Sequence, residues 1–220
     1  MVIQNLILRP EREEDQRIAE NVTREAFWNH HGPGCNEHYL LHIMRGCDAF
    51  IPELDYIAEL QGEIVGHIAY THSKIIGDNG KTFKVISFGP ISVLPNHQGK
   101  GIGKALIEKT KIIARSLGYQ AILIYGDPEY YKKVGFKGAE EYGIGTAGDY
   151  YAAPLLACEL VEGALRGKAG RFFEDEAFDI SEEMANEFDK AFPVKTKIEG
   201  LPSQHRFLEL IKMRKPRHTS

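Results

Sequence analysis

The stretch that most constrains this chain runs from Ile91 to Ile107, where a β-branched segment leads through a proline and a glycine-rich turn into an amphipathic segment. Gly99, Gly101 and Gly103 alternate in the turn, so the backbone can fold tightly with several N–H groups pointing one way. A helix that begins there adds its unpaired first-turn N–H groups and the positive end of its dipole. The stretch therefore predicts a strand, a turn and a helix that together bind an anion such as phosphate or pyrophosphate.

Two common phosphate-binding motifs do not fit this turn. A Walker A loop requires Gly-Lys followed by Ser or Thr, but Gly103-Lys104 is followed by Ala105, and Gln98 occupies the position of the first glycine. The dinucleotide motif requires G-x-G-x-x-G, whereas the chain has G-x-G-x-G. Neither nucleotide motif is therefore expected.

The pattern Gln98-x-x-Gly101-x-Gly103 resembles the Q/R-x-x-G-x-G/A motif with which the GNAT superfamily of N-acetyltransferases binds the pyrophosphate of acetyl-coenzyme A. The alternative is a glycine-rich helix start without a ligand. The resemblance implies acetyl-CoA as cosubstrate, with pantetheine lying along the strand that precedes the turn. The cofactor-binding residues expected from it are Ile91, Ser92, Val93, Gln98, Gly99, Lys100, Gly101, Ile102, Gly103 and Lys104.

Composition narrows the class of protein. The 220 residues are 43% hydrophobic and 26% charged, which is typical of a globular protein. A net charge of −4 argues against a nucleic-acid partner. Three cysteines without metal-site spacing argue against a disulfide framework. The N-terminal sequence does not resemble a signal peptide, and no apolar run approaches the ~20 residues that cross a bilayer. We expect a cytoplasmic protein without a membrane partner, and a homodimer stays open.

The hydrophobic pattern predicts a mixed α/β domain. Helical and strand periods, with glycine and proline stops, give one order of elements. They are a strand at 2–8 closed by Arg9-Pro10, helices at 11–28 and 37–45 (the second capped by Asn36), strands at 54–60, 63–76 and 82–93, a helix at 101–117 ended by Gly118, a strand at 121–125, a helical turn at 129–133, and final strands at Phe136 and 150–160. Gly89-Pro90 predicts a bulge or splay. The order resembles a GNAT-like acyl-CoA N-acyltransferase fold over residues 1–163.

Residues 164–220 form a predicted C-terminal extension. Acidic residues from 174 to 189 alternate with phenylalanines, and a disordered acidic tail normally has fewer aromatics. We expect the phenylalanines to pack on the domain and the acids to face water. Were the acids to line the cleft, they would attract a cationic acceptor. The basic end of the chain, from Lys212 onward, is expected to fray.

A second motif, Glu129 to Phe136, resembles the Y-x-x-x-G-F element of GNAT proteins, whose tyrosine lies near the acetyl sulfur. The spacing selects Tyr131 rather than Tyr130. A phenol with a pKa of about 10 can protonate the thiolate that leaves when an amine attacks a thioester. Many members have an asparagine seven residues before this tyrosine, where this chain has Ile124.

The general base is less well defined by the sequence. The strand from Phe83 to Val93 has no carboxylate, so a base common in the family is missing. Polar side chains in or beside the central strands are alternatives, and a water-relayed base is the default; these side chains are Glu53, Asp55, His67 and His72. His38 and His42 have helical i, i+4 spacing, but H-E-x-x-H is absent and we predict no metal.

The resemblance also implies that the first two helices and their loop form the acceptor site. The substrate-contact residues expected from it are Phe27, Trp28, Glu37, His38, Tyr39 and Glu53. The spans 34–39 and 50–54 also resemble the YhbS-like branch of predicted acetyltransferases. That branch does not identify the acceptor, so small amines, antibiotics, amino acids, polyamines and protein amines stay open as substrates.

The leading hypothesis is an acetyl-CoA-dependent N-acetyltransferase that moves the acetyl group to a primary amine by direct attack in a ternary complex. No cysteine lies near either motif, which argues against an acyl-cysteine intermediate. The alternative is a CoA-binding regulatory or interaction module without transfer activity, which Ile124 favours and Tyr131 opposes. Transfer of a longer acyl group also stays open.

Overall fold

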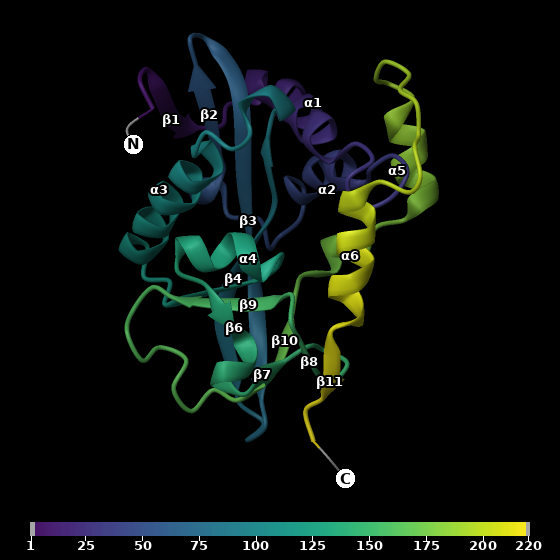
Figure 1. Ribbon diagram of the computed structural model, residues 1–220. Helices are drawn as coiled ribbons and strands as arrows, with labels where there is room; N and C mark the ends of the chain where they lie inside the picture. Colours follow the sequence, from purple (N-terminus) through teal and green to yellow (C-terminus); the bar gives the residue numbers. More distant parts are fainter. Residues whose placement is uncertain (1–2, 219–220) are drawn as a thin grey trace. The chain divides into compact units, whose positions relative to one another are not determined.

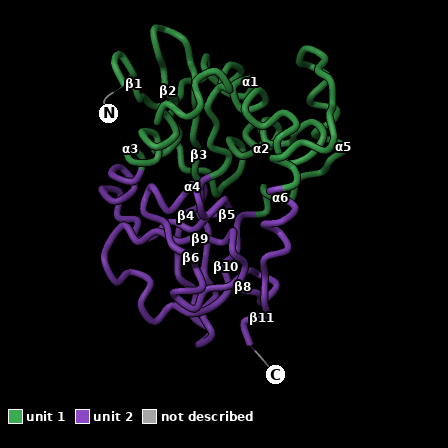
Figure 2. Tube along the Cα trace, viewed as in Figure 1, with its two compact units in different colours: residues 1–70, 89–110, 176–205 green, residues 71–88, 111–175, 206–220 purple. Residues whose placement is uncertain are grey.

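The computed structural model describes residues 3–218. Figure 1 shows the helices and strands of the chain. The chain forms two compact units (Figure 2), and several elements contribute residues to both. Unit 1 comprises residues 1–70, 89–110 and 176–205, and unit 2 comprises residues 71–88, 111–175 and 206–220. Segments that are distant in sequence therefore fold together within each unit.

Unit 1 pairs antiparallel strands and covers them with short helices. Leu6 lies opposite Leu60, and Tyr56 lies opposite Ile68. Its elements are β1 (Leu6–Pro10), η1 (Glu13–Asp15), α1 (Gln16–Phe27), α2 (Glu37–Met44), η2 (Pro52–Leu54), β2 (Tyr56–Leu60), the first part of β3 (Glu63–Gly77), the end of β4 (Thr82–Val93), η3 (Pro95–His97), most of α3 (Ile102–Ser116), η6 (Glu176–Phe178), α5 (Glu182–Asp189) and the start of α6 (Pro202–Lys212). One core cluster joins Ala19, Leu41 and Met44 of the two N-terminal helices to Ala69 of β3.

Unit 2 is a mixed sheet. β3 and β4 are connected by a short turn in which the Gly77 N–H donates to the Lys81 carbonyl. β4 pairs in parallel with β5 at Ile86 and Ile122, and β5 pairs antiparallel with β9. The further elements of this unit are β5 (Ala121–Tyr125), α4 (Pro128–Tyr131), η4 (Lys132–Val134), β6 (Lys137–Gly138), η5 (Ala139–Tyr142), β7 (Ile144–Gly145), β8 (Tyr150–Ala152), β9 (Leu155–Glu159), β10 (Gly170–Phe173) and β11 (Arg214–Pro216). The mixed sheet confirms the predicted fold class.

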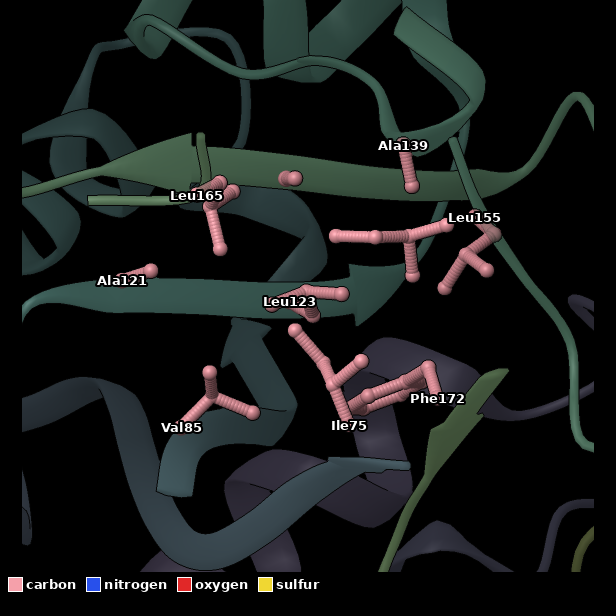
Figure 3. Packing of buried hydrophobic residues seen from close by; sticks show 10 residues of the cluster. Ile75, Val85, Ala121, Leu123, Ala139, Leu155, Leu165 and Phe172 are labelled. Carbon is pink, nitrogen blue, oxygen red and sulfur yellow. The ribbon is translucent and has the colours of Figure 1, made fainter. Parts of the chain in front are cut away.

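An apolar cluster forms the core of unit 2 (Figure 3). Ile75, Val85, Leu123 and Phe172 come from four strands and point toward one another. Phe172 belongs to β10, which pairs antiparallel with β3 and in parallel with β7. A strand of the predicted extension thus lies in the same sheet as the central strands. The boundary at residue 163 stays a prediction.

Several element predictions are confirmed by the structure. β4 and β5 have the predicted bounds, and α3 ends before Gly118, whose φ of 90° is left-handed. The predicted helix at 11–28 divides into η1 and α1, and part of the predicted first strand lies outside the described residues. The predicted strand at 150–160 divides into β8 and β9 at Ala153-Pro154. Phe136 precedes a two-residue strand.

Three predictions are wrong in detail. The Asn36 side chain makes no capping hydrogen bond; instead Glu37 accepts from the Asn36 N–H. The basic end of the chain does not fray over its described residues, because β11 pairs with β8 and Arg217 is buried. The acids of 174–189 do not all face water, since Asp189 forms an ion pair with the buried Arg24.

Candidate functional site

The loop before α3 is tied to the end of β4. The Gln98 side chain donates from Nε2 to the Val93 carbonyl at 3.0 Å, and the Leu94 N–H donates to the Val65 carbonyl at 2.9 Å. Gln98 therefore positions the loop through its side chain. A contact between Gln98 and a ligand would use atoms of Gln98 other than Nε2.

The turn that follows has the geometry of an anion site. Gly99 and Gly101 have φ values of 73° and 92°, which L side chains rarely adopt. Ala105 donates to the Gly101 carbonyl at 3.0 Å, so the first-turn N–H groups before it have no carbonyl within the helix. Lys100 and Lys104 are exposed beside them. Oriented N–H groups, a helix dipole and two cations together suit a phosphate ligand.

A glycine in β3 allows the start of α3 to approach the sheet closely. A Cβ on Gly66 would lie 3.1 Å from the Ser92 carbonyl oxygen and 3.3 Å from side-chain carbons of Ile102 and Leu106. Ser92 itself is buried, and its hydroxyl lies 3.0 Å from the Thr23 hydroxyl. Of the predicted strand residues, Ser92 thus has its side chain committed to α1, and a contact with pantetheine would use its backbone.

Tyr131 lies in unit 2 within a group of aromatic rings. Its ring centroid is 5.9 Å from that of Phe88 and 5.7 Å from that of Phe136. A Cβ on Gly126 would lie 2.2 Å from Tyr131 Cε2, so the ring packs directly on the backbone of Gly126. Burial raises the pKa of Tyr131. The phenol therefore stays protonated over the working pH range and can serve as a proton donor.

The helical turn that carries Tyr131 is anchored by Asp127 and by Arg206, of which the sequence did not identify Arg206. Asp127 accepts a hydrogen bond from the Glu129 N–H at the start of α4. Arg206 of α6 donates to both oxygens of Asp127, at 2.9 and 3.2 Å. Hydrogen bonding from Arg206 lowers the pKa of Asp127. The cap was visible as Asp127-Pro128, but its partner is distant in the sequence.

Three predicted substrate-contact residues are covered by the C-terminal segment of unit 1. The Trp28 indole donates to the Thr196 carbonyl at 2.9 Å. His38 is fully buried, with Nε2 3.0 Å from an Asp189 oxygen, and Tyr39 packs against Phe188 with ring centroids 5.5 Å apart. These contacts give the three residues a direct packing role.

The other predicted substrate-contact residues are more accessible. Phe27 packs on His31 with ring centroids 5.6 Å apart, and Glu37 accepts from His31 Nδ1 at 2.9 Å if that nitrogen is protonated. Glu53 is exposed in η2. Their contact with an acceptor stays a prediction.

Two of the candidate bases belong to a buried polar network. His67 Nε2 lies 2.6 Å from Asp55 and 3.5 Å from Glu11. Burial raises the pKa of Glu11 to about 7. The three ligand atoms lie within 4.8 Å of one another, but Arg45 already donates to both oxygens of Glu11 at 2.8 and 2.7 Å. A cation there would face a guanidinium, so the network is better explained as structural.

Comparison with known proteins places these features in a family. Residues 53–138 match the acetyltransferase (GNAT) domain. The N-acetyltransferase YjhQ of Escherichia coli, itself uncharacterised, is 33% identical over 86 residues, which is 39% of this chain and 47% of YjhQ. The chain thus matches about half the length of that relative. The uncharacterised N-acetyltransferase YhbS of the same species is 22% identical over 131 residues, covering 60% of this chain and 76% of YhbS.

Solved structures show the same fold. E. coli YhbS in complex with CoA has a TM-score of 0.69 at 21% identity, covering 82% of this chain and 95% of YhbS. A GNAT family acetyltransferase from Brucella melitensis in complex with acetyl-CoA has a TM-score of 0.63 at 27% identity, covering 79% and 98%. Within residues 3–218, no helix is long and apolar enough to cross a membrane. Residues 53–138 thus match the acetyltransferase (GNAT) domain, and the chain is similar to the N-acetyltransferases YhbS and YjhQ.

Proposed function

We propose that this protein transfers an acetyl group from acetyl-CoA to a primary amine by direct attack in a ternary complex, in the cytoplasm. The observation that carries the proposal is the turn before α3, where Gly99 and Gly101 have left-handed φ values and the first helical N–H groups lack helical partners. The CoA and acetyl-CoA held by the two similar solved structures support the choice of ligand.

Each part of the proposed reaction has a residue type suited to it. The turn and the exposed Lys100 and Lys104 bind the pyrophosphate, because oriented N–H groups and ammonium groups complement its charge. Backbone groups of Ile91 and Val93 bind pantetheine. Tyr131 donates its phenolic proton to the departing thiolate, a role that its raised pKa suits since the phenol is neutral before the step.

The first experiment follows release of the CoA thiol from acetyl-CoA over a panel of primary amines. Tyr131→Phe should lower the turnover rate by about 10²–10⁴-fold, the range for a lost general acid. Tyr130→Phe is the matched control, because Tyr130 is adjacent, 42% exposed and packed against the Tyr131 ring. The control should keep the rate within about twofold.

Binding separates this function from a CoA-binding module. Acetyl-CoA binding without turnover on any amine would favour the CoA-binding module without transfer activity. The buried Ile124, at the position where many family members have an asparagine, is consistent with that alternative. Equal rates for wild type and Tyr131→Phe would remove the acid role from Tyr131. Gly101→Val should abolish acetyl-CoA binding, because a β-branched side chain is strained at a φ of 92°.

A further inference from the structure

One face of the sheet in unit 2 changes from apolar to polar along its strands. Its apolar part is the cluster that contains Ile75 of β3, Val85 of β4, Leu123 of β5 and Phe172 of β10 (Figure 3). Because side chains alternate along a strand, residues two positions further on lie on the same face. β4 and β5 run parallel, and β3 and β10 run antiparallel to each other with Phe172 opposite Ile75. At one end of the cluster the next positions in this alternation are Ser73, Ser87, Tyr125 and Glu174, which directly follows β10, and Thr71 comes one step beyond Ser73.

These five residues, the polar row, include hydroxyls without partners. Thr71 and Ser87 are fully buried, and Ser73 is 9% exposed. The three hydroxyl oxygens have no hydrogen-bond partner within the part of the chain that the structure describes. Buried hydroxyls are normally satisfied by protein, water or ligand. Three such groups on the adjacent strands β3 and β4 lack the partner that a bound polar molecule would supply.

Glu174 lies at the level of these hydroxyls. Phe173 is the last residue of β10 and pairs with Lys74, and Glu174 follows it directly, so we place Glu174 near Ser73 by extending the register. Within residues 3–218 no hydrogen bond or ion pair is recorded for its carboxylate. Its charge acts on the phenol of Tyr125, whose ring lies 6.1 Å from that of Phe172. The carboxylate is thus half-buried near the Tyr125 phenol without a counter-charge.

The polar row is connected through the backbone to the proposed proton donor. Tyr125 ends β5, and Gly126 follows it. The Tyr131 ring packs on Gly126, where an added Cβ would lie 2.2 Å from Cε2. Tyr125 keeps 41% of its surface exposed, so the end of the row is open to an approaching molecule.

We propose that the polar row is the acceptor site, that it takes a primary alkylammonium group, and that Glu174 is the general base of the transfer. The inference rests on the proposed acetyltransferase function. A primary ammonium has three N–H donors, and the row offers a carboxylate, a phenol oxygen and hydroxyl oxygens as acceptors. The unpaired charge of Glu174 selects a cation, and the Tyr125 ring adds an attractive face for it.

The proton balance of the step is closed by two residues. Glu174 takes one proton from R–NH₃⁺, and the free amine attacks the thioester carbonyl carbon. The new C–N bond forms, the C–S bond breaks, and the thiolate takes the Tyr131 proton. The attacking nitrogen loses its second proton, which returns the phenol to its neutral form. Glu174 then releases its proton to solvent, so that R–NH₃⁺ and acetyl-CoA give the amide, CoA–SH and H⁺.

The electrostatics of Glu174 suit this role. Burial raises the pKa of Glu174 to about 7, and a base works best when its pKa lies near the working pH. Tyr125 is the titratable group that faces it, and burial followed by the Glu174 charge raises the pKa of that phenol. Tyr125 therefore stays neutral and does not compete for the proton.

The test measures thiol release against pH with butylamine, spermidine, lysine and a tripeptide as acceptors. In wild type the rate should rise with pH up to about 7, where Glu174 ionises, and then level off. Glu174→Gln should lower the rate at pH 7.5 by about 10²–10⁴-fold and should replace the plateau by a continued rise toward the pKa of the free amine. Acetyl-CoA affinity should change by less than about threefold.

Two further variants make the outcome specific. Glu176→Gln is the matched control, because this acid is exposed two residues further along, and its rate and pH profile should match wild type. Thr71→Val removes a buried hydroxyl with little change in shape. It should raise the KM for the amine about five- to tenfold while the melting temperature stays equal or rises, since the hydroxyl has no partner to lose.

The failures of the two proposals are distinguishable. If wild type acetylates an amine and Glu174→Gln keeps its rate, or loses rate while keeping the plateau near pH 7, the base assignment is wrong and the acetyltransferase function stands. An unchanged amine KM in Thr71→Val overturns the acceptor site. Acetyl-CoA binding without turnover on any acceptor by wild type would overturn the proposed function and this inference with it.

Discussion

Replacement of Asp189 by asparagine tests how the C-terminal segment is held in unit 1. The Arg24 side chain is 1% exposed, and its Nε and Nη2 donate to the two Asp189 oxygens at 2.5 and 3.1 Å. The guanidinium carbon lies 4.4 Å from the Trp28 ring centroid and 5.3 Å from that of Phe192. Asp189 is thus the anion that neutralises a cation enclosed by aromatic rings.

The expected loss of stability follows from leaving the buried Arg24 guanidinium without the Asp189 carboxylate. Removing one partner of a buried ion pair costs about 3–5 kcal/mol, because the remaining charge is desolvated and unpaired. Asp189 itself is 23% exposed, so water can reach the Arg24 fork, and we expect the lower end, about 3 kcal/mol. For a protein of this length that corresponds to a fall in melting temperature of roughly 6–12 °C.

Urea denaturation and thermal melting of Asp189→Asn measure the loss. Glu187→Gln is the matched control on the same helix, because Glu187 and its partner Lys190 are 72% and 71% exposed. Exposed pairs contribute at most about 1 kcal/mol, so the control should lie within about 0.5 kcal/mol of wild type. A loss for Asp189→Asn no larger than that of the control would refute the reasoning that this pair holds α5.

Three other predictions use separate parts of the molecule. Gly126→Ala should lower the acetyl-transfer rate at least tenfold, because its Cβ would lie 2.2 Å from Tyr131 Cε2; an unchanged thiol-release rate would contradict the proposed position of that ring. Arg217→Ala should cost about 1–3 kcal/mol in urea denaturation, because this 2% exposed side chain makes hydrogen bonds to three distant segments, whereas the exposed Arg214→Ala should cost less than about 0.5 kcal/mol. Burial raises the pKa of Glu174 from 4.5 to about 7, so the native state binds more protons than the unfolded state between these values and stability falls as pH rises through them. Glu174→Gln should therefore match wild type near pH 4.5 and exceed it above pH 7 by up to about 3 kcal/mol, and parallel stability curves for the two proteins would show that the carboxylate is well solvated.

Local sequence patterns predicted the parts of the fold that depend on local chemistry. The bounds of β4 and β5 follow from β-branched runs that end at turn residues. Gly118 ends α3 because glycine adopts a left-handed φ without strain. The turn at Gly99 and Gly101 was visible for the same reason. In each case the information lies within a few residues of the element.

Features that depend on distant pairings were missed. The basic end of the chain was expected to fray, yet Arg217 donates to Asp78 and Asp149 at 2.8 and 2.9 Å. The partners of Trp28 and His38 in the C-terminal segment, Thr196 and Asp189, were not predicted, and the acceptor contact of Trp28 and His38 stays a prediction. No local pattern predicts these contacts. A basic chain end and an acidic run have the same composition whether their side chains form ion pairs or face water.

The proposed role of Glu174 was also not predicted, because its environment depends on distant segments. Comparison with the other buried carboxylates explains why we propose Glu174 as the general base. Asp15 is bound by Arg9, Glu11 by Arg45, and Asp189 by Arg24, so each of those carboxylates already has a guanidinium as its partner.

Glu174 has the opposite arrangement. Its charge acts on the phenol of Tyr125 and burial raises its pKa, so the ionised carboxylate destabilises the native state at neutral pH. A carboxylate paired with arginine already has a cationic partner and is less available to bind an ammonium group. A buried carboxylate without a counter-charge lowers the stability of the folded protein. It also has a raised pKa and a higher affinity for a cation. The arrangement is therefore costly for folding alone, and the proposed cationic acceptor would supply a counter-charge for Glu174 and up to three N–H donors for the groups around it.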